Sequence, residues 1–136
     1  MPLMEWTTKL SVGVQQFDEE HQRLVALINE LFDAMLAGKG KDVLGHILDG
    51  LVSYTKVHFA HEEQFLRVHQ FPGFEEHQAE HAVLTEQVMD ALQRYRAGAG
   101  SSFTMEVLNF LKNWLLKHIQ GTDRRYTAFL NDRGVS

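Results

Sequence analysis

The sequence contains no cysteine, and this absence excludes several kinds of chemistry at once. Without thiols the chain forms no disulfide, binds no zinc through thiolates and has no cysteine nucleophile. Any metal ion must therefore be held by nitrogen and oxygen atoms. The sequence also lacks any apolar run that approaches the roughly 20 residues of a membrane-spanning helix.

A basic cluster is missing as well. The formal net charge is −5, so nothing in the sequence predicts an electrostatic surface for nucleic acid. The N-terminal segment MPLMEWTTKL has neither a basic start nor an apolar stretch, which argues against a secretory signal and makes a cytoplasmic location the expectation. With 136 residues, 44% hydrophobic and 23% charged, the composition is typical of one globular domain, residues 1–136.

Four stretches of the sequence have the periodicity of amphipathic helices, with apolar residues three, four and seven positions apart. After an ordered N-terminal arm, residues 1–17, we expect helices over about 18–37, 41–68, 74–96 and 103–131, the last with a distortion or break near residue 121. Four long helices with short connections predict an all-α, up-down-up-down four-helix bundle.

Capping and helix-breaking residues set the expected ends of these helices. Asp18, followed by two glutamates, is the expected N-cap of the first helix. The pair Gly38 and Gly40 ends that helix, and Pro72 separates the second helix from the third. The Gly- and Ser-rich residues 97–102 are the expected linker to the fourth.

Histidines and a glutamate lie on the apolar faces of these predicted helices. They are His21 in the first helix, His58 and Glu62 in the second, His77 and His81 in the third, and His118 in the fourth. Burying this many ionisable groups costs on the order of several kcal/mol each unless a cation compensates them. The pattern therefore predicts a buried metal site between four helices.

Asp123 does not follow this pattern, because in a regular helix it lies roughly 140° around the axis from His118. By spacing alone, a solvent-facing aspartate and a metal ligand are equally good interpretations. Gly121 between the two residues would allow a wider local turn, which would bring Asp123 toward the site.

The number of histidines indicates two metal ions rather than one. His77 and His81 are four residues apart and can bind the same ion, and His58 and Glu62 have the same spacing. Five imidazoles exceed what a tetrahedral zinc ion accepts. Two octahedral ions offer twelve positions, and five histidines, two bridging carboxylates and a bridging oxide or hydroxide leave one of them open. Imidazole with carboxylate suits iron, although zinc and manganese remain alternatives.

Four sequence segments resemble the hemerythrin family, and specifically its single-domain bacterial form. They are FDEEH (residues 17–21), HFAHEE (58–63), HQAEH (77–81) and WLLKHIQGTD (114–123). The resemblance extends over essentially the whole chain and includes Trp6 in the arm. It implies two iron ions (Fe²⁺/Fe³⁺) with a bridging oxo or hydroxo group, and O₂ as the ligand.

The resemblance also implies a role for each site residue. His77, His81 and His118 would bind one iron, His21 and His58 the other, and Glu62 and Asp123 would bridge the two. The implied function is reversible O₂ binding at the iron held by two histidines. The protein would be an oxygen carrier or store, not an enzyme, supplying an oxygen-consuming enzyme that could be membrane-bound. We expect a monomer with no membrane insertion.

Four further residues are candidates for the wall of the O₂ pocket. Leu24 follows His21 by three residues and Leu115 precedes His118 by three, and Phe59 and Trp114 are further candidates. Ordinary core packing is the alternative interpretation for all four. Outside the site, His46 and His69 are expected on the surface. His61 is expected to be partly exposed, with a supporting or alternative ligand role as the other interpretation.

Two other kinds of function can be compared with this one. Ferritin-like di-iron oxidases and storage proteins use two Glu-x-x-His pairs, and no glutamate in this sequence has a histidine three residues later. An oxygen or redox sensor that signals to a partner protein remains the main alternative. Iron storage or detoxification fits the sequence less well.

Overall fold

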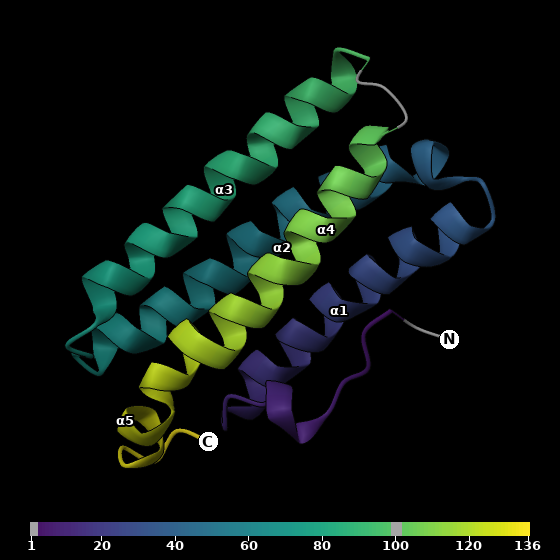
Figure 1. Ribbon diagram of the computed structural model, residues 1–136. Helices are drawn as coiled ribbons and strands as arrows, with labels where there is room; N and C mark the ends of the chain where they lie inside the picture. The colour runs from purple at the N-terminus through teal and green to yellow at the C-terminus, as the bar shows by residue number, and fades with distance from the viewer. Residues whose placement is uncertain (1–2, 99–101) are drawn as a thin grey trace.

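Four long helices run side by side in alternating directions (Figure 1). The computed structural model describes residues 3–98 and 102–136, and these residues form helices and turns without a strand. The helices are α1 (Gln15–Leu36), α2 (Gly40–Val68), α3 (Phe74–Arg96) and α4 (Ser102–Lys117), followed by the short α5 (Thr127–Asn131). The predicted all-α four-helix bundle is thus confirmed. Residues 99–101 of the expected linker lie outside the described residues.

The first helix begins earlier than the sequence predicted. It starts at Gln15, with the extended residue Val14 in the N-cap position, so the prediction that Asp18 caps this helix is wrong. The Asp18 carboxylate lies in the first turn and accepts hydrogen bonds from the Ser11 hydroxyl at 2.6 Å and the Val12 amide at 2.8 Å. Asp18 therefore fastens the arm to the helix, at a helix end where negative charge is favourable.

The N-terminal arm packs against the end of the chain. Its side chains Met4, Leu10, Val12 and Val14 are buried. The Thr127 hydroxyl donates to the carbonyl of Val12 at 2.7 Å, and the Asn131 amide donates to the carbonyl of Gly13 at 3.0 Å. These bonds join the arm to α5, so residues at opposite ends of the sequence hold one another in place (Figure 1).

The expected distortion near residue 121 is present. After α4 the chain forms a π-helical turn, His118–Thr122, and then a 3₁₀ turn, Asp123–Tyr126. The amide of Asp123 bonds to the carbonyl of His118, five residues back. The π-helical turn has more residues per turn than an α-helix. Asp123 therefore faces the interior of the bundle, which it would not do in a regular helix.

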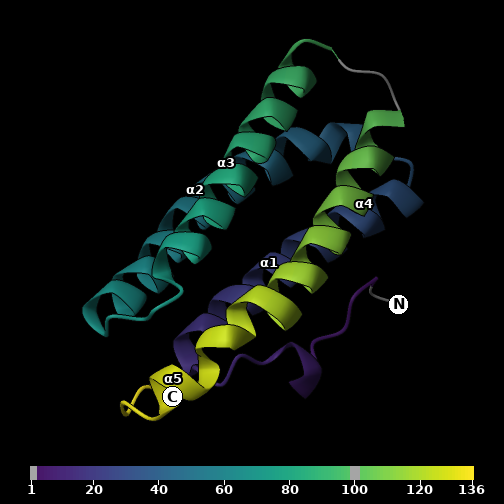
Figure 2. The same ribbon diagram turned by 60° about the vertical axis from the view of Figure 1, so that its left-hand side comes forward.

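The long helices do not pack on one another equally closely. α1 packs closely on α2, α2 on α3, and α4 lies against α1, whereas the described part of α3 makes few contacts with α4. Figure 2 shows this separation between α3 and α4. Among the described residues, no helix is both long and apolar enough to cross a membrane.

Candidate metal centre

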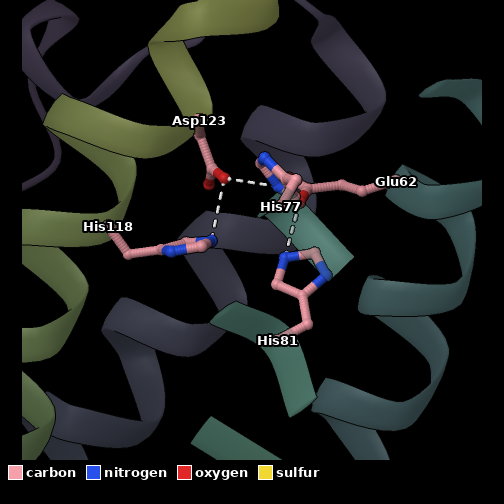
Figure 3. Close-up of side chains that lie close together, drawn as sticks. All are labelled: Glu62, His77, His81, His118 and Asp123. Carbon is pink, nitrogen blue, oxygen red and sulfur yellow. Dashed lines mark hydrogen bonds and ion pairs between the residues drawn. The ribbon is translucent and has the colours of Figure 1, made fainter. Parts of the chain in front are cut away.

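Seven side chains from all four long-helix segments meet in one buried cluster (Figure 3 shows five of them). They are His21, His58, Glu62, His77, His81, His118 and Asp123, and none is more than 4% exposed. Their donor atoms form two groups, in each of which the atoms lie within 4.8 Å of one another. The "three-histidine group" is His77, His81 and His118 with Glu62 and Asp123, and the "two-histidine group" is His21 and His58 with Glu62.

The Glu62 carboxylate faces both groups, one oxygen to each. Its Oε1 lies 3.0 Å from Nε2 of His77 and 3.2 Å from Nε2 of His81. Its Oε2 lies 3.2 Å from Nε2 of His58 and 3.3 Å from Nε2 of His21. This is the arrangement that a carboxylate bridging two cations requires.

The Asp123 carboxylate also faces both groups, one oxygen to each. Its Oδ1 lies 2.9 Å from Nε2 of His118 and 3.0 Å from Nε2 of His77. Its Oδ2 lies 3.2 Å from Nε2 of His21. The π-helical turn therefore gives the cluster a second carboxylate with one oxygen toward each group.

The electrostatics of the cluster favour positive charge at its centre. Burial lowers the pKa of His21 and of His77, but hydrogen bonds with Asp123 and Glu62, and the charges of these carboxylates, raise both pKa values to about 10. Burial raises the pKa of Glu62, yet the neighbouring histidines hold it well below its usual value. The carboxylates thus stabilise either protons on the histidines or a cation in their place.

Five buried polar atoms of the cluster make no well-aligned hydrogen bond. They are Nδ1 of His21, Nε2 of His81, Nε2 of His118 and both carboxylate oxygens of Asp123. All but Nδ1 of His21 instead face oppositely charged groups of the cluster within 3.2 Å, and poorly bonded buried polar atoms are costly. Nitrogen and oxygen donors in this number fit a pair of borderline metal ions such as iron.

Three glutamates outside the cluster support its histidines. Nδ1 of His58 lies 2.7 Å from Glu20, Nδ1 of His81 lies 3.0 Å from Glu63, and Nδ1 of His118 lies 3.2 Å from Glu80. A carboxylate on the outer nitrogen fixes the tautomer and orientation of a metal-binding imidazole. Sequence reasoning missed these glutamates, although each is next in sequence to a ligand candidate.

Tyr126 is a further site residue that the sequence analysis missed. It is fully buried, and its hydroxyl donates to Oε2 of Glu62 at 2.8 Å. Burial and the charge of Glu62 raise the pKa of Tyr126 well above 10, so the phenol stays a donor. Its position three residues after Asp123 was the available signal.

The remaining histidines lie outside the cluster. His46 is exposed, and His69 is half-buried with its ring stacked on Phe65. His61 has a side chain that is 40% exposed, and its Nδ1 lies 2.6 Å from Glu20. The prediction of a partly exposed His61 is confirmed, and Glu20 connects its ring to His58.

The four side chains expected to line an O₂ pocket lie in different parts of the site. The ring of Phe59 stacks on His81 with centroids 3.8 Å apart, and the ring of Trp114 stacks on His118 at 4.6 Å. Trp114 therefore lies against the three-histidine group, whereas Phe59 lies between the groups, because its ring is also 5.8 Å from that of His58. The O₂ site was expected at the two-histidine ion. Leu24 and Leu115 are buried in the core, and a role for the four side chains in an O₂ pocket stays a prediction.

Comparisons with known proteins give one family. The family profile "Hemerythrin HHE cation binding domain" matches residues 12–130. Bacteriohemerythrin of Stenotrophomonas maltophilia is 31% identical over 93% of this chain and 80% of its own length, and that of Methylococcus capsulatus is 29% identical over 96% and 99%. A crystal structure of wild-type hemerythrin superposes with a TM-score of 0.83 at 28% identity, covering 93% of this chain and 96% of that one. Since the profile spans most of the sequence and the solved structure shares its fold, the chain belongs to the hemerythrin family.

Proposed function

We propose that this protein binds O₂ reversibly at a di-iron centre and acts as an oxygen carrier or store. The observation that carries the proposal is the division of both central carboxylates between two unequal histidine groups. Counting one oxygen of each carboxylate, the three-histidine group offers five protein ligands and the two-histidine group four. This inequality supports an assignment of the O₂ position to the ion at His21 and His58.

The residues would divide the work as follows. A pair of iron ions would supply the two electrons that reversible O₂ binding requires. The five histidines and the two bridging carboxylates would hold these ions, and Tyr126 would donate its hydrogen bond to Glu62. Buried Leu115, Leu24 and Ile28 would keep water away from the bound gas. We propose that no substrate is turned over and that the O₂ passes to an oxygen-consuming enzyme.

An oxygen or redox sensor is a second candidate, because the segment that carries Asp123 is also tied to the arm. Thr127, four residues after Asp123, donates its hydrogen bond to Val12. A change at the centre that moved Asp123 would therefore reach residues 3–14 at the protein surface. Such a signal requires the arm to differ between the reduced and oxygenated states.

One set of measurements tests the proposal. The purified protein is analysed for metal, reduced, and its visible absorption recorded before and after air is admitted and again after air is removed. We expect two irons per chain and a charge-transfer band that appears and disappears with O₂. A single zinc ion, or irreversible oxidation accompanied by substrate turnover, would contradict it.

Hydrogen exchange separates the two candidate functions. For a carrier, residues 3–14 should exchange equally fast in the reduced and oxygenated protein. A sensor should show a change in the arm's protection that is lost in Thr127→Val, whose O₂ binding should stay intact. A shift confined to residues beside the ligands would favour the carrier.

A further inference from the structure

Hollows on the surface lead to the three-histidine group. One lies between α3 and α4, has a volume of about 340 Å³ and reaches His118. A smaller one of about 30 Å³ reaches His77. A third, between α2 and α3, reaches His81. Each of these histidines thus lies at the base of a surface depression on the side of α3 (Figure 3 shows the three side chains).

Glu80 lies between two of these hollows. It lines both the one that reaches His118 and the one that reaches His77. Its side chain is 46% exposed, and its Oε2 lies 3.2 Å from Nδ1 of His118, which is only 4% exposed. Nε2 of the same His118 ring faces Oδ1 of Asp123 at 2.9 Å without a well-aligned hydrogen bond. The Glu80 carboxylate is therefore in contact with both the solvent and the buried His118 ring.

The boundary between α3 and the α4 segment, here called the α3–α4 seam, is lightly closed. The helices themselves make few contacts along it. Outside the cluster and its supporting Glu80, two ion pairs cross it, Arg94–Glu106 at 3.4 Å and Arg125–Glu76 at 3.6 Å, and all four side chains are more than half exposed. Exposed ion pairs contribute little to stability, so opening here costs less than separating α2 from α1 or α3.

We propose that divalent iron enters and leaves the centre through the α3–α4 seam, with Glu80 as its first protein ligand. The inference rests on the proposed di-iron centre. A hydrated ferrous ion would exchange one water for the exposed Glu80 carboxylate and then pass to the ligand nitrogens of His118 and His77. At the mouth, Glu76 is paired with Arg125, and Lys117 lines the hollow that reaches His118, so the carboxylate that would attract the cation is Glu80 itself. No oxidation or reduction is involved.

The experiment measures both directions of iron transfer without O₂. Metal-free protein is mixed with Fe²⁺ under anaerobic conditions, and uptake is stopped at set times with a coloured ferrous chelator. Release is followed by adding the same chelator to loaded protein. Glu80→Gln keeps the size and hydrogen-bonding atoms of the side chain and removes its charge. Its matched control is Glu30→Gln, on an exposed face of α1.

A second pair of variants tests the path itself. Val83 is 55% exposed and lines the hollow that reaches His118, so Val83→Trp would obstruct the seam without changing charge. Val68→Trp, at an exposed position at the end of α2, is its control. Circular dichroism and thermal melting establish that all four variants are folded.

We expect Val83→Trp to slow uptake and release by the same factor, about fivefold or more, with two irons still bound and the affinity unchanged. We expect Glu80→Gln to slow uptake by a similar factor. Because Glu80→Gln also removes the support of His118, its affinity for iron should fall as well. The controls should match the parent protein. If Glu80→Gln lowers affinity at an unchanged uptake rate and Val83→Trp changes neither rate, Glu80 only supports His118 and the route is wrong. If both variants bind two irons at the rates of the parent protein, the entry route is wrong and the proposed di-iron centre is unaffected. A parent protein that takes up no iron overturns the proposed centre and the route with it.

Discussion

The two histidine groups share their bridging carboxylates but have different surroundings. His77, His81 and His118 lie under surface hollows along α3. His58 of the other group lies between aromatic rings, stacked with Tyr54 at 5.4 Å and edge-on to Phe17 at 6.2 Å. Donor atoms of the same kind can therefore serve different purposes. In the functions proposed above, the first group would exchange ions, and the second would hold a ligand that must be kept from water.

The largest effect is expected from the residue that belongs to both groups. Glu62→Ala removes the carboxylate that faces four histidines, so we expect iron to fall from two ions to fewer than one per chain. His58→Ala is the contrasting variant, because it should empty the two-histidine group and leave about one iron at the other. Metal analysis after anaerobic loading measures both. Equal iron loss in the two variants would mean that the groups do not load separately.

The glutamates that support the histidines allow the same test, a Glu→Gln substitution, in each histidine group. Glu20→Gln weakens the support of His58, and Glu63→Gln that of His81. Loss of such support typically costs about 10–100-fold in metal affinity. In a two-step ferrous titration, each variant should shift only the step of its own group. A shift of both steps in both variants would show that the carboxylates act through overall charge.

Water exclusion can be tested at Leu115. This side chain is fully buried one turn before His118, and an amide there would bring a polar group beside the centre. We expect Leu115→Asn to speed irreversible oxidation of the oxygenated protein by about tenfold. Leu111→Asn, one turn earlier in α4 and further from the centre, is the matched control. Decay of the visible band measures the rate, and an unchanged rate in Leu115→Asn would count against the pocket assignment.

A smaller effect is expected from the pH dependence of stability. One histidine in each group, His77 and His21, contributes to it. The pKa values of His21 and His77 rise from 6.5 to about 10 in the folded metal-free protein. Their contribution to its stability is therefore complete below about pH 6.5 and is lost as the pH rises toward 10. Metal ions compete with these protons, so the Tm difference between loaded and metal-free protein should increase over this range. A Tm difference independent of pH would contradict the coupling.

The sequence predicted the fold and the cluster because both depend on helical periodicity. Buried histidines at spacings of four must share a face, so His77 and His81 could be placed without a structure. Spacing alone could not place Asp123, since its position depends on a π-helical turn. Gly121 and the family resemblance were what pointed to it. The prediction of an N-cap at Asp18 failed because tertiary bonds from Ser11 and Val12 use that carboxylate instead.

Contacts between helices escaped prediction for a related reason. Glu20, Glu63 and Glu80 look like ordinary surface residues in sequence, because their partners are on other helices. The sparse contact between α3 and α4 was equally hidden, since the apolar stripe of α3 resembles the others. Periodicity shows which face of a helix is buried, and it does not show which neighbour covers it.

The three supporting glutamates follow an order along the chain. Glu20 on α1 reaches His58 on α2, Glu63 on α2 reaches His81 on α3, and Glu80 on α3 reaches His118 after α4. Each helix thus carries the group that orients a ligand on the next. As the chain leaves the ribosome, each new hairpin can set its own register from the helix already made. The geometry of the centre would then be assembled stepwise during synthesis, before any metal ion arrives.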